Sequence, residues 1–230
     1  MAEPVWDDVL RAAAHLQALV PDAVLVGGTA AATHAAHRVS FDDDHVLTDL
    51  RERFDEVLTH LEEHDGWVTS RVNRPVLILG SLDGIETGIR QLIRTRPLEV
   101  EELAGPAGPI RVPTLVEMLR IKAWLVLRRN ATRDYLDVVA LAGRLGPEEA
   151  ARTALALDAY YDDQRGPGGR RIATQLARQL AEPAPYDLSD VDLQTYRRLE
   201  ARWRDWGEVS AACNALATGM LTLLAGESAG

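Results

Sequence analysis

The feature that most constrains the fold is a glycine turn between an apolar segment and an Ala-rich one. The stretch 23–36 begins as a short buried strand, turns through Gly27-Gly28-Thr29 and continues in residues typical of a helix. Glycines allow a ligand to approach the backbone closely. The N–H groups at the start of such a helix can bind phosphate oxygens. The pattern therefore predicts a phosphate-binding turn.

A second motif follows the turn after a gap of twelve residues, where the chain reads Asp42-Asp43-Asp44. In a strand, Asp42 and Asp44 point to one side and Asp43 points to the other. Two carboxylates on one face suit Mg²⁺, which prefers oxygen ligands. Bound divalent ions assist phosphoryl and nucleotidyl transfer by stabilising the attacking and leaving oxygens. The alternative is a solvated acidic turn that caps the next helix.

The rest of the chain divides into a β-rich and a helical part. Short β segments cover 67–93, and further extended chain is expected over 97–112, around a Gly- and Pro-rich loop at 105–109 that is the best candidate boundary. We predict an α+β fold with a mixed sheet over residues 1–112 and an all-helical domain over 113–230. The expected helices are 4–20, 48–63, 114–129, 132–145, 148–162, 170–181, 189–205 and 207–225.

Composition narrows the class of protein. The net charge of -10 argues against tight, non-specific binding to duplex nucleic acid. The single cysteine, Cys213, excludes an internal disulfide framework. The acidic N-terminus and the lack of a long uninterrupted apolar run predict a cytoplasmic protein without a membrane partner. Only one of the 25 basic residues is lysine, Lys122.

With these motifs the sequence resembles minimal nucleotidyltransferases of the DNA polymerase β superfamily. The stretch 37–44 (HRVSFDDD) more narrowly resembles the Arg-x-Ser-x-Asp-x-Asp motif of AbiEii-type toxins, the toxin halves of type IV toxin–antitoxin pairs. Lys122 and the stretch 133–137 (RDYLD) resemble the lysine and Arg-Asp-x-x-Asp motifs of that family. The resemblance covers about residues 23–145; Asp43 and His45 depart from it, because the family usually has apolar residues there.

For the N-terminal part the resemblance implies a nucleotide site and a metal site. Gly27, Gly28 and Thr29 would bind the nucleoside triphosphate. Asp42 and Asp44 would act as catalytic ligands of Mg²⁺, with Mn²⁺ as a substitute. Ser40 would lie beside them in the nucleotide site; in some relatives the antitoxin phosphorylates this serine.

The resemblance also implies a third carboxylate on a later strand, as a further ligand of the metal. The candidates are Glu86 and Asp83, and Glu86 has the better strand context.

For the helical part the resemblance implies that Lys122 binds and neutralises the triphosphate. Asp134 or Asp137 would complete the catalytic cluster; the two lie three residues apart and share a helix face. The alternative for Lys122 is a side chain that extends from an apolar helix face to solvent. Six arginines could line an RNA groove or lie on solvated faces: Arg90, Arg94, Arg96, Arg128, Arg129 and Arg133.

The predicted activity is Mg²⁺-dependent nucleotidyl transfer, of EC 2.7.7 type. The resemblance implies a toxin that transfers a nucleotide to RNA, most simply to the 3′ end of tRNA, with a cognate antitoxin as partner. One alternative is transfer to a protein hydroxyl or to a small molecule such as an aminoglycoside. Another is a catalytically silent module that binds nucleotide or a partner.

Overall fold

The computed structural model describes residues 5–165 and 168–228, and these form two compact units. Unit 1 takes in the chain up to Thr33 and then Val39–Thr114; unit 2 takes in His34–Arg38 and the chain from Leu115 onward. The sequence placed a boundary at 112/113. The short excursion of the chain into unit 2 at 34–38 was not anticipated.

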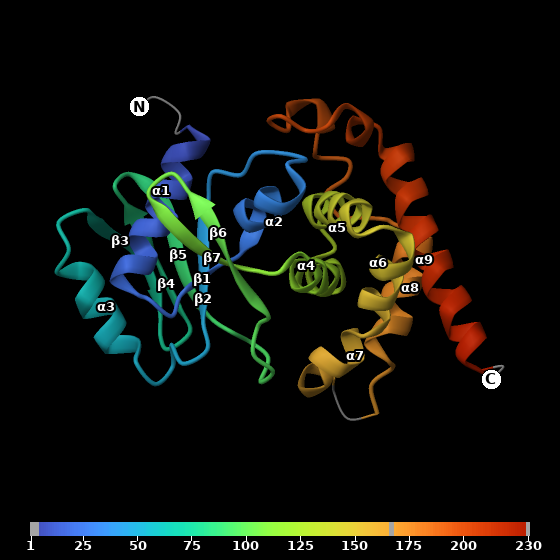
Figure 1. Ribbon diagram of the computed structural model, residues 1–230, viewed down its shortest axis with the longest axis horizontal. Helices are drawn as coiled ribbons and strands as arrows, with labels where there is room; N and C mark the ends of the chain where they lie inside the picture. Colours follow the sequence, from blue (N-terminus) through green and yellow to red (C-terminus); the bar gives the residue numbers. More distant parts are fainter. Residues whose placement is uncertain (1–4, 166–167, 229–230) are drawn as a thin grey trace. The chain divides into compact units, whose positions relative to one another are not determined.

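Unit 1 is built on a five-stranded mixed sheet (Figure 1). Strands β2 and β5 are parallel, and the other neighbouring strands are antiparallel. The strands in sheet order are β1 (Val24–Leu25), β2 (Asp43–Leu47), β5 (Ile85–Gln91), β4 (Leu77–Leu82) and β3 (Trp67–Asn73). This sheet and the helical C-terminal part confirm the predicted α+β class.

The core of unit 1 forms where α1 (Trp6–Leu19) and α3 (Phe54–Glu62) pack on the sheet. Leu16 of α1, Leu61 of α3 and Ile89 of β5 belong to one fully buried cluster. Each buried aliphatic side chain contributes roughly 1.5–3 kcal/mol to the free energy of unfolding. This cluster holds β2 and β5 side by side, and those two strands carry the predicted carboxylates.

Helix α3 is shorter than the predicted 48–63. The segment 48–53 before it forms bends and turns. In it, Asp49 binds the Arg53 side chain, and the Asp49 carbonyl accepts from the N–H groups of Glu52 and Arg53.

The loop at 105–109 is not a domain boundary. It is the turn of a hairpin within unit 1, formed by β6 (Val100–Gly105) and β7 (Gly108–Pro113). Gly and Pro residues favour hairpin turns as well as boundaries between domains, and here they mark a turn between paired strands.

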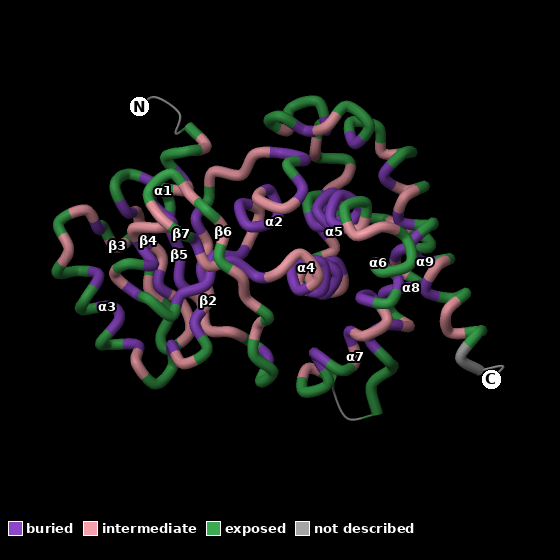
Figure 2. The backbone as a smooth tube through the Cα atoms, in the orientation of Figure 1, coloured by how far each residue is buried: buried purple, intermediate pink, exposed green. Residues whose placement is uncertain are grey.

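Unit 2 is helical. In Figure 2, α4 and α5 are mostly buried, as expected for the centre of a helical unit. The α-helices are α4 (Leu115–Arg129), α5 (Thr132–Leu145), α6 (Pro147–Leu155), α7 (Leu157–Tyr160), α8 (Ile172–Ala181) and α9 (Trp206–Ser228), and α2 (Gly27–Ala35) leads into this unit.

The predicted helix over 189–205 is wrong. The segment contains only two short 3₁₀ turns, η2 (Leu193–Thr195) and η3 (Ala201–Arg204). Asp192 accepts a hydrogen bond from the N–H of Gln194, and Arg198 has a left-handed φ of 52°. A non-glycine residue in that conformation ends a helical run.

Helix α9 packs one face, which includes Val209, Cys213 and Met220, into unit 2. Among the residues described, only its stretch Trp206–Gly226 is both long enough and apolar enough to span a membrane, with a mean hydropathy of 1.5. Core helices can meet the same criterion. The expected absence of a membrane partner stays a prediction.

Candidate active site

The Gly-Gly-Thr turn opens α2 in unit 1, directly after β1. Gly27 has a φ of +73°, in the left-handed region that favours glycine. The first helical hydrogen bond runs from the N–H of Ala30 to the carbonyl of Val26, so the three preceding N–H groups are not used inside the helix. Such groups at a helix start are suited to phosphate oxygens.

Thr29 has a structural role in addition to its place in the turn. Its side chain is fully buried, and its hydroxyl donates a 2.6 Å hydrogen bond to the carbonyl oxygen of Asp42. This bond ties the start of α2 to the acidic segment. A nucleotide contact by Thr29 would therefore come from its backbone N–H, not from its hydroxyl.

The three aspartates divide between two environments, as alternation predicts. Asp43 is fully buried, whereas Asp44 is half-buried and Asp42, just before β2, is exposed. Burial raises the pKa of Asp43 well above its usual range, and the neighbouring Asp44 charge adds to the shift. Burial lowers the pKa of His45, on the same face as Asp43, to about 3. His45 is thus a neutral core residue near pH 7, and burial favours the protonated form of the Asp43 carboxyl.

The parallel pairing of β2 with β5 puts Glu86 in the matching position. Asp43 pairs with Thr87 and Asp44 with Gly88. The same register, continued by one residue, places Glu86 opposite Asp42. Alternation then gives Glu86 and Gly88 the same face as Asp44. The other candidate, Asp83, lies in the β4–β5 turn, where it binds His15 Nδ1 at 2.7 Å.

The Asp44 carboxylate is bordered by glycines and by one arginine. A Cβ at Gly27 or at Gly88 would lie 3.2 Å from an Asp44 carboxylate oxygen, so both positions leave room beside it. Arg90 Nε lies 3.6 Å from Asp44 Oδ1. This guanidinium, on the same strand face, was proposed from sequence only as a groove residue. Ser40 precedes the strand and is half-buried.

The carboxylates of Asp42, Asp44 and Glu86 do not form a complete metal site by themselves. Within residues 5–165 and 168–228 no group of three or more His, Cys, Asp or Glu side chains is placed to hold an ion. Mg²⁺ is usually bound through one or two carboxylates together with substrate phosphates. Asp42 and Asp44, with room left by the two glycines, fit that kind of site.

The remaining predicted residues lie in unit 2, around the fully buried Asp137 of α5. Its carboxylate binds Lys122 Nζ at 2.7 Å, Arg38 Nε at 2.8 Å and Nη2 at 3.0 Å, and His37 Nε2 at 2.7 Å. Burial alone would raise the pKa of Asp137, but Arg38, Lys122 and His37 hold it well below its usual range. Asp137 is therefore ionised.

This cluster changes the interpretation of Lys122. The side chain is 4% exposed and is bound to Asp137, so it does not extend to solvent. Sequence reasoning did not anticipate that His37 and Arg38 share the same carboxylate. The signal available was their position in the HRVS stretch directly before the aspartates.

Asp134 lies one helical turn before Asp137 and is 1% exposed. Burial raises its pKa; the Lys122 charge opposes this shift and the Asp137 charge adds to it. Of the proposed groove arginines, Arg94 is buried and donates to the carbonyls of Arg96 and Pro97, so it supports local backbone.

Comparison with known proteins gives a fold and partial sequence matches. No protein-family model matches the chain. A stretch of 129 residues, 56% of the chain, is 36% identical to the Heme uptake protein MmpL11 of Mycobacterium tuberculosis (strain ATCC 25618 / H37Rv). The chain covers only 13% of the length of that relative.

Solved structures resemble the chain more completely. A candidate nucleotidyltransferase from H. pylori is similar with a TM-score of 0.56 and 16% identity, over 95% of this chain and 94% of that one. ANT(2")-Ia in complex with adenylyl-2"-tobramycin is similar with a TM-score of 0.50 and 13% identity, over 66% of this chain and 95% of that one. The chain therefore has the fold of nucleotidyltransferase-like proteins.

Proposed function

We propose that the protein is a nucleotidyltransferase that transfers a nucleoside monophosphate from a triphosphate to an acceptor hydroxyl. One observation carries the proposal: on this fold, β2 and β5 place Asp42, Asp44 and Glu86 on one face, and Gly27 lies beside Asp44. Accessible carboxylates next to a phosphate-binding helix start suit transfer chemistry.

Each part of unit 1 has a defined task in this proposal. The N–H groups of Gly27 and Gly28 hold phosphate oxygens. Asp42 and Asp44 hold Mg²⁺, or Mn²⁺ in its place, which when bound would supply charge neutralisation at the phosphates. The acceptor oxygen forms a bond to the α-phosphorus, the bond from that phosphorus to the bridging oxygen breaks, and pyrophosphate leaves. Glu86 takes the proton of the hydroxyl.

In unit 2, Lys122 stays a proposed triphosphate contact. Its ammonium would have to share or leave Asp137, to which it is bound at 2.7 Å. An ammonium can rearrange in this way because its three donors are not fixed in a plane as those of arginine are. Asp137, which binds Lys122, then acts on the nucleotide through that lysine.

For the acceptor we propose the 3′ end of tRNA, and for the biological role an AbiEii-type toxin in the cytoplasm with a cognate antitoxin. The stretch 37–44 supports this choice, because it resembles the toxin motif in arginine, serine and aspartate positions. Ser40 is half-buried in that stretch and would be the site at which an antitoxin acts.

The test is incubation of the full chain with total tRNA, Mg²⁺ and each labelled nucleoside triphosphate. We expect label on tRNA with wild type and a loss of at least about a hundredfold with Asp42→Ala or Asp44→Ala, because removal of key electrostatic groups costs factors of this order. Asp49→Ala is the matched control, because Asp49 is a partly exposed aspartate whose carboxylate binds Arg53 outside the proposed site. Equal labelling by Asp44→Ala and wild type would reject the proposal.

A second candidate acceptor is a small molecule such as an aminoglycoside. The similarity to ANT(2")-Ia, whose structure contains adenylyl-2"-tobramycin, favours it. The net charge of -10 suits a cationic acceptor better than an RNA. Label on tobramycin and none on tRNA or protein would select this candidate, whereas Mg²⁺-independent triphosphate binding without turnover would indicate a silent binding module.

A further inference from the structure

One face of the sheet in unit 1 packs on helices, and the other face is partly exposed. Ile78 of β4 and Ile89 of β5 lie on the first face, in the core that α1 and α3 cover. Side chains alternate along a strand, so the residues between these point the other way. On β4 the alternate residues are Leu77, Leu79 and Ser81, and all three are half-buried.

The neighbouring strands extend this partly exposed surface on both sides of β4. Arg71 of β3 lies opposite Leu79, and Arg90 of β5 lies opposite Leu77. The surface, here named the open face, consists of Val68, Arg71 and Asn73 of β3, Leu77, Leu79 and Ser81 of β4, and Glu86, Gly88 and Arg90 of β5.

The open face is continuous with the Asp44 carboxylate. Gly88 lies between the two, because a Cβ there would be 2.8 Å from Leu79 Cδ2 and 3.2 Å from Asp44 Oδ1. Arg90 Nε is 3.6 Å from the same Asp44 oxygen. A molecule that lies along the open face therefore reaches the proposed metal site.

Away from Asp44 the charge of the open face is positive. Strands β3 and β4 contain no acidic residue. Arg71 is exposed and has no carboxylate partner among the residues that the structure describes. The Arg90 side chain is 43% exposed, and its distance from Asp44 exceeds that of a hydrogen bond. Both guanidinium groups are therefore available to anions, although the net charge of the chain is -10.

The two arginines lie on opposite sides of an apolar strip. They are two strands apart and offset by two residues, so strand spacings of about 4.8 Å and rises of about 3.4 Å put their Cα atoms roughly 12 Å apart. Leu77 and Leu79 lie between them, and Val68 beside them is 65% exposed. This pattern matches a flexible polyanion with less polar groups between its charges, which is the chemistry of a single nucleic-acid strand.

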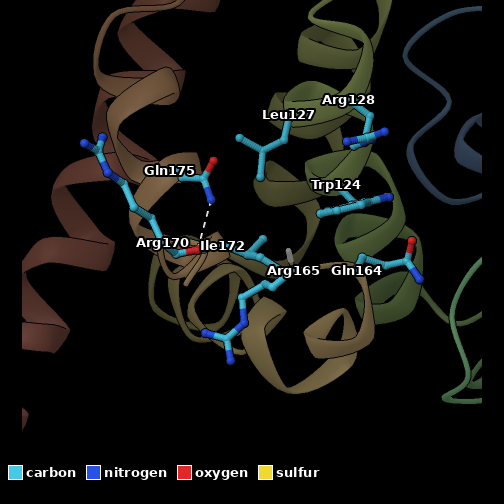
Figure 3. Close-up of a pocket in the computed structure, with 9 residues that line it drawn as sticks. Trp124, Leu127, Arg128, Gln164, Arg165, Arg170, Ile172 and Gln175 are labelled. Atoms are coloured by element: carbon cyan, nitrogen blue, oxygen red, sulfur yellow. Dashed lines mark hydrogen bonds between the residues drawn. The ribbon is translucent and has the colours of Figure 1, made fainter. Parts of the chain in front are cut away.

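The pocket of unit 2 in Figure 3 differs from the open face in its apolar surface. Trp124 and Ile172 line that pocket, but they are only 6% and 2% exposed. The Trp124 ring is already stacked on Tyr161, with the ring centroids 4.6 Å apart. These side chains are packed within the protein, whereas Val68 of the open face is exposed.

We propose that the open face binds the acceptor end of a single-stranded RNA, with separate phosphates at Arg71 and Arg90 and the strand over Leu77 and Leu79. The role as acceptor rests on the proposed transfer function, but binding itself requires no turnover. The 3′ hydroxyl of the strand lies at Asp44. Two cations on this path repel a cationic acceptor such as an aminoglycoside, so the open face favours RNA between the two candidate acceptors.

The test measures binding of a 5′-fluorescein RNA octamer to the full chain by anisotropy, with Mg²⁺ and without nucleoside triphosphate. The double variant Arg71→Gln/Arg90→Gln should raise the dissociation constant at least about tenfold, since hydrogen bonds to charged groups are worth that factor. The slope of log K against log salt should fall in magnitude by about 1.4, because each phosphate contact on a single strand contributes about 0.7. Arg11→Gln/Arg178→Gln makes the same charge change at exposed positions of α1 and α8.

We expect the control pair to bind RNA like wild type, and Asp44→Ala to keep RNA binding. Octamer binding that depends on Arg71 and Arg90, without label on any acceptor, would support the open face and reject the transfer function. Label on tRNA with octamer binding unchanged in Arg71→Gln/Arg90→Gln would do the reverse. No octamer binding, equal losses in both double variants, an unchanged salt slope, or tighter binding of a duplex octamer would overturn the proposal.

Discussion

Unit 1 and unit 2 use acidic side chains in opposite ways. Around Asp44 the neighbours are glycines and a half-exposed arginine at 3.6 Å, so the carboxylate is open to a ligand. Asp137 is fully buried and is bound by three cationic or polar side chains. A carboxylate in a motif that resembles one of a known family can therefore either bind a ligand or position the residues around it. Only its surroundings distinguish these two roles.

The largest expected difference between the two regions is in stability. Asp137→Asn removes the charge that neutralises Arg38 and Lys122, and breaking a buried ion pair costs about 3–5 kcal/mol. Asp44→Asn should change the free energy of unfolding by less than about 1 kcal/mol, because its pair with Arg90 is partly exposed. Urea denaturation of both variants measures this. Similar losses would mean that the two carboxylates do not differ as described.

A smaller loss is expected for Lys122→Arg. The variant keeps the charge, but the larger planar guanidinium must fit a site where the side chain is 4% exposed. Overpacking of a buried site costs about 1–3 kcal/mol. Thermal unfolding measures the loss, and Arg178→Lys at an exposed position of α8 is the control. Activity lost without a loss of stability would instead favour direct phosphate contact by Lys122.

Alanine substitutions at two glycines of unit 1 distinguish the effect of backbone strain from the effect of blocking a ligand. Gly27 and Gly84 have φ values of +73° and +82°, so alanine at either should cost about 1–2 kcal/mol. Only at Gly27 does the added Cβ come within 3.2 Å of the Asp44 carboxylate, and nothing lies within 4 Å of it at Gly84.

We therefore expect similar melting temperatures for Gly27→Ala and Gly84→Ala, with nucleotide binding weakened only in Gly27→Ala. The measurement is titration with a nucleoside triphosphate and Mg²⁺. Equal binding by the two variants would contradict a phosphate-binding role for this turn.

The smallest expected effect is a change in the free energy of unfolding at low pH. The cations around Asp137 hold its pKa well below the usual value of about 3.9. A carboxylate whose pKa is lower when folded contributes stability above its unfolded pKa and loses it as pH falls toward the folded value. The difference in free energy of unfolding between wild type and Asp137→Asn should therefore narrow below about pH 4. A difference that is constant from pH 7 to pH 3 would argue against an ionised Asp137.

Much of unit 1 could be predicted because its signals are local. Alternation in β2 correctly separates Asp43 from Asp44, and the turn residues correctly mark the strands. The predicted helix over 189–205 failed because apolar spacing says nothing of the bond between Asp192 and Gln194 that competes with it. The loop at 105–109 was misread because Gly and Pro favour hairpin turns as well as boundaries.

The sequence by itself determined the α+β class, the glycine turn that opens α2 and the order of the charged motifs, since these depend on residue periodicity and on neighbours along the chain. Tertiary structure alone decided which carboxylate lies opposite Asp42, because strand register pairs β2 with β5 across more than 40 positions. It also decided that Lys122 and Arg38 meet at Asp137. Burial strengthens such ion pairs and makes each charge depend on its partners, which no spacing in the chain can reveal.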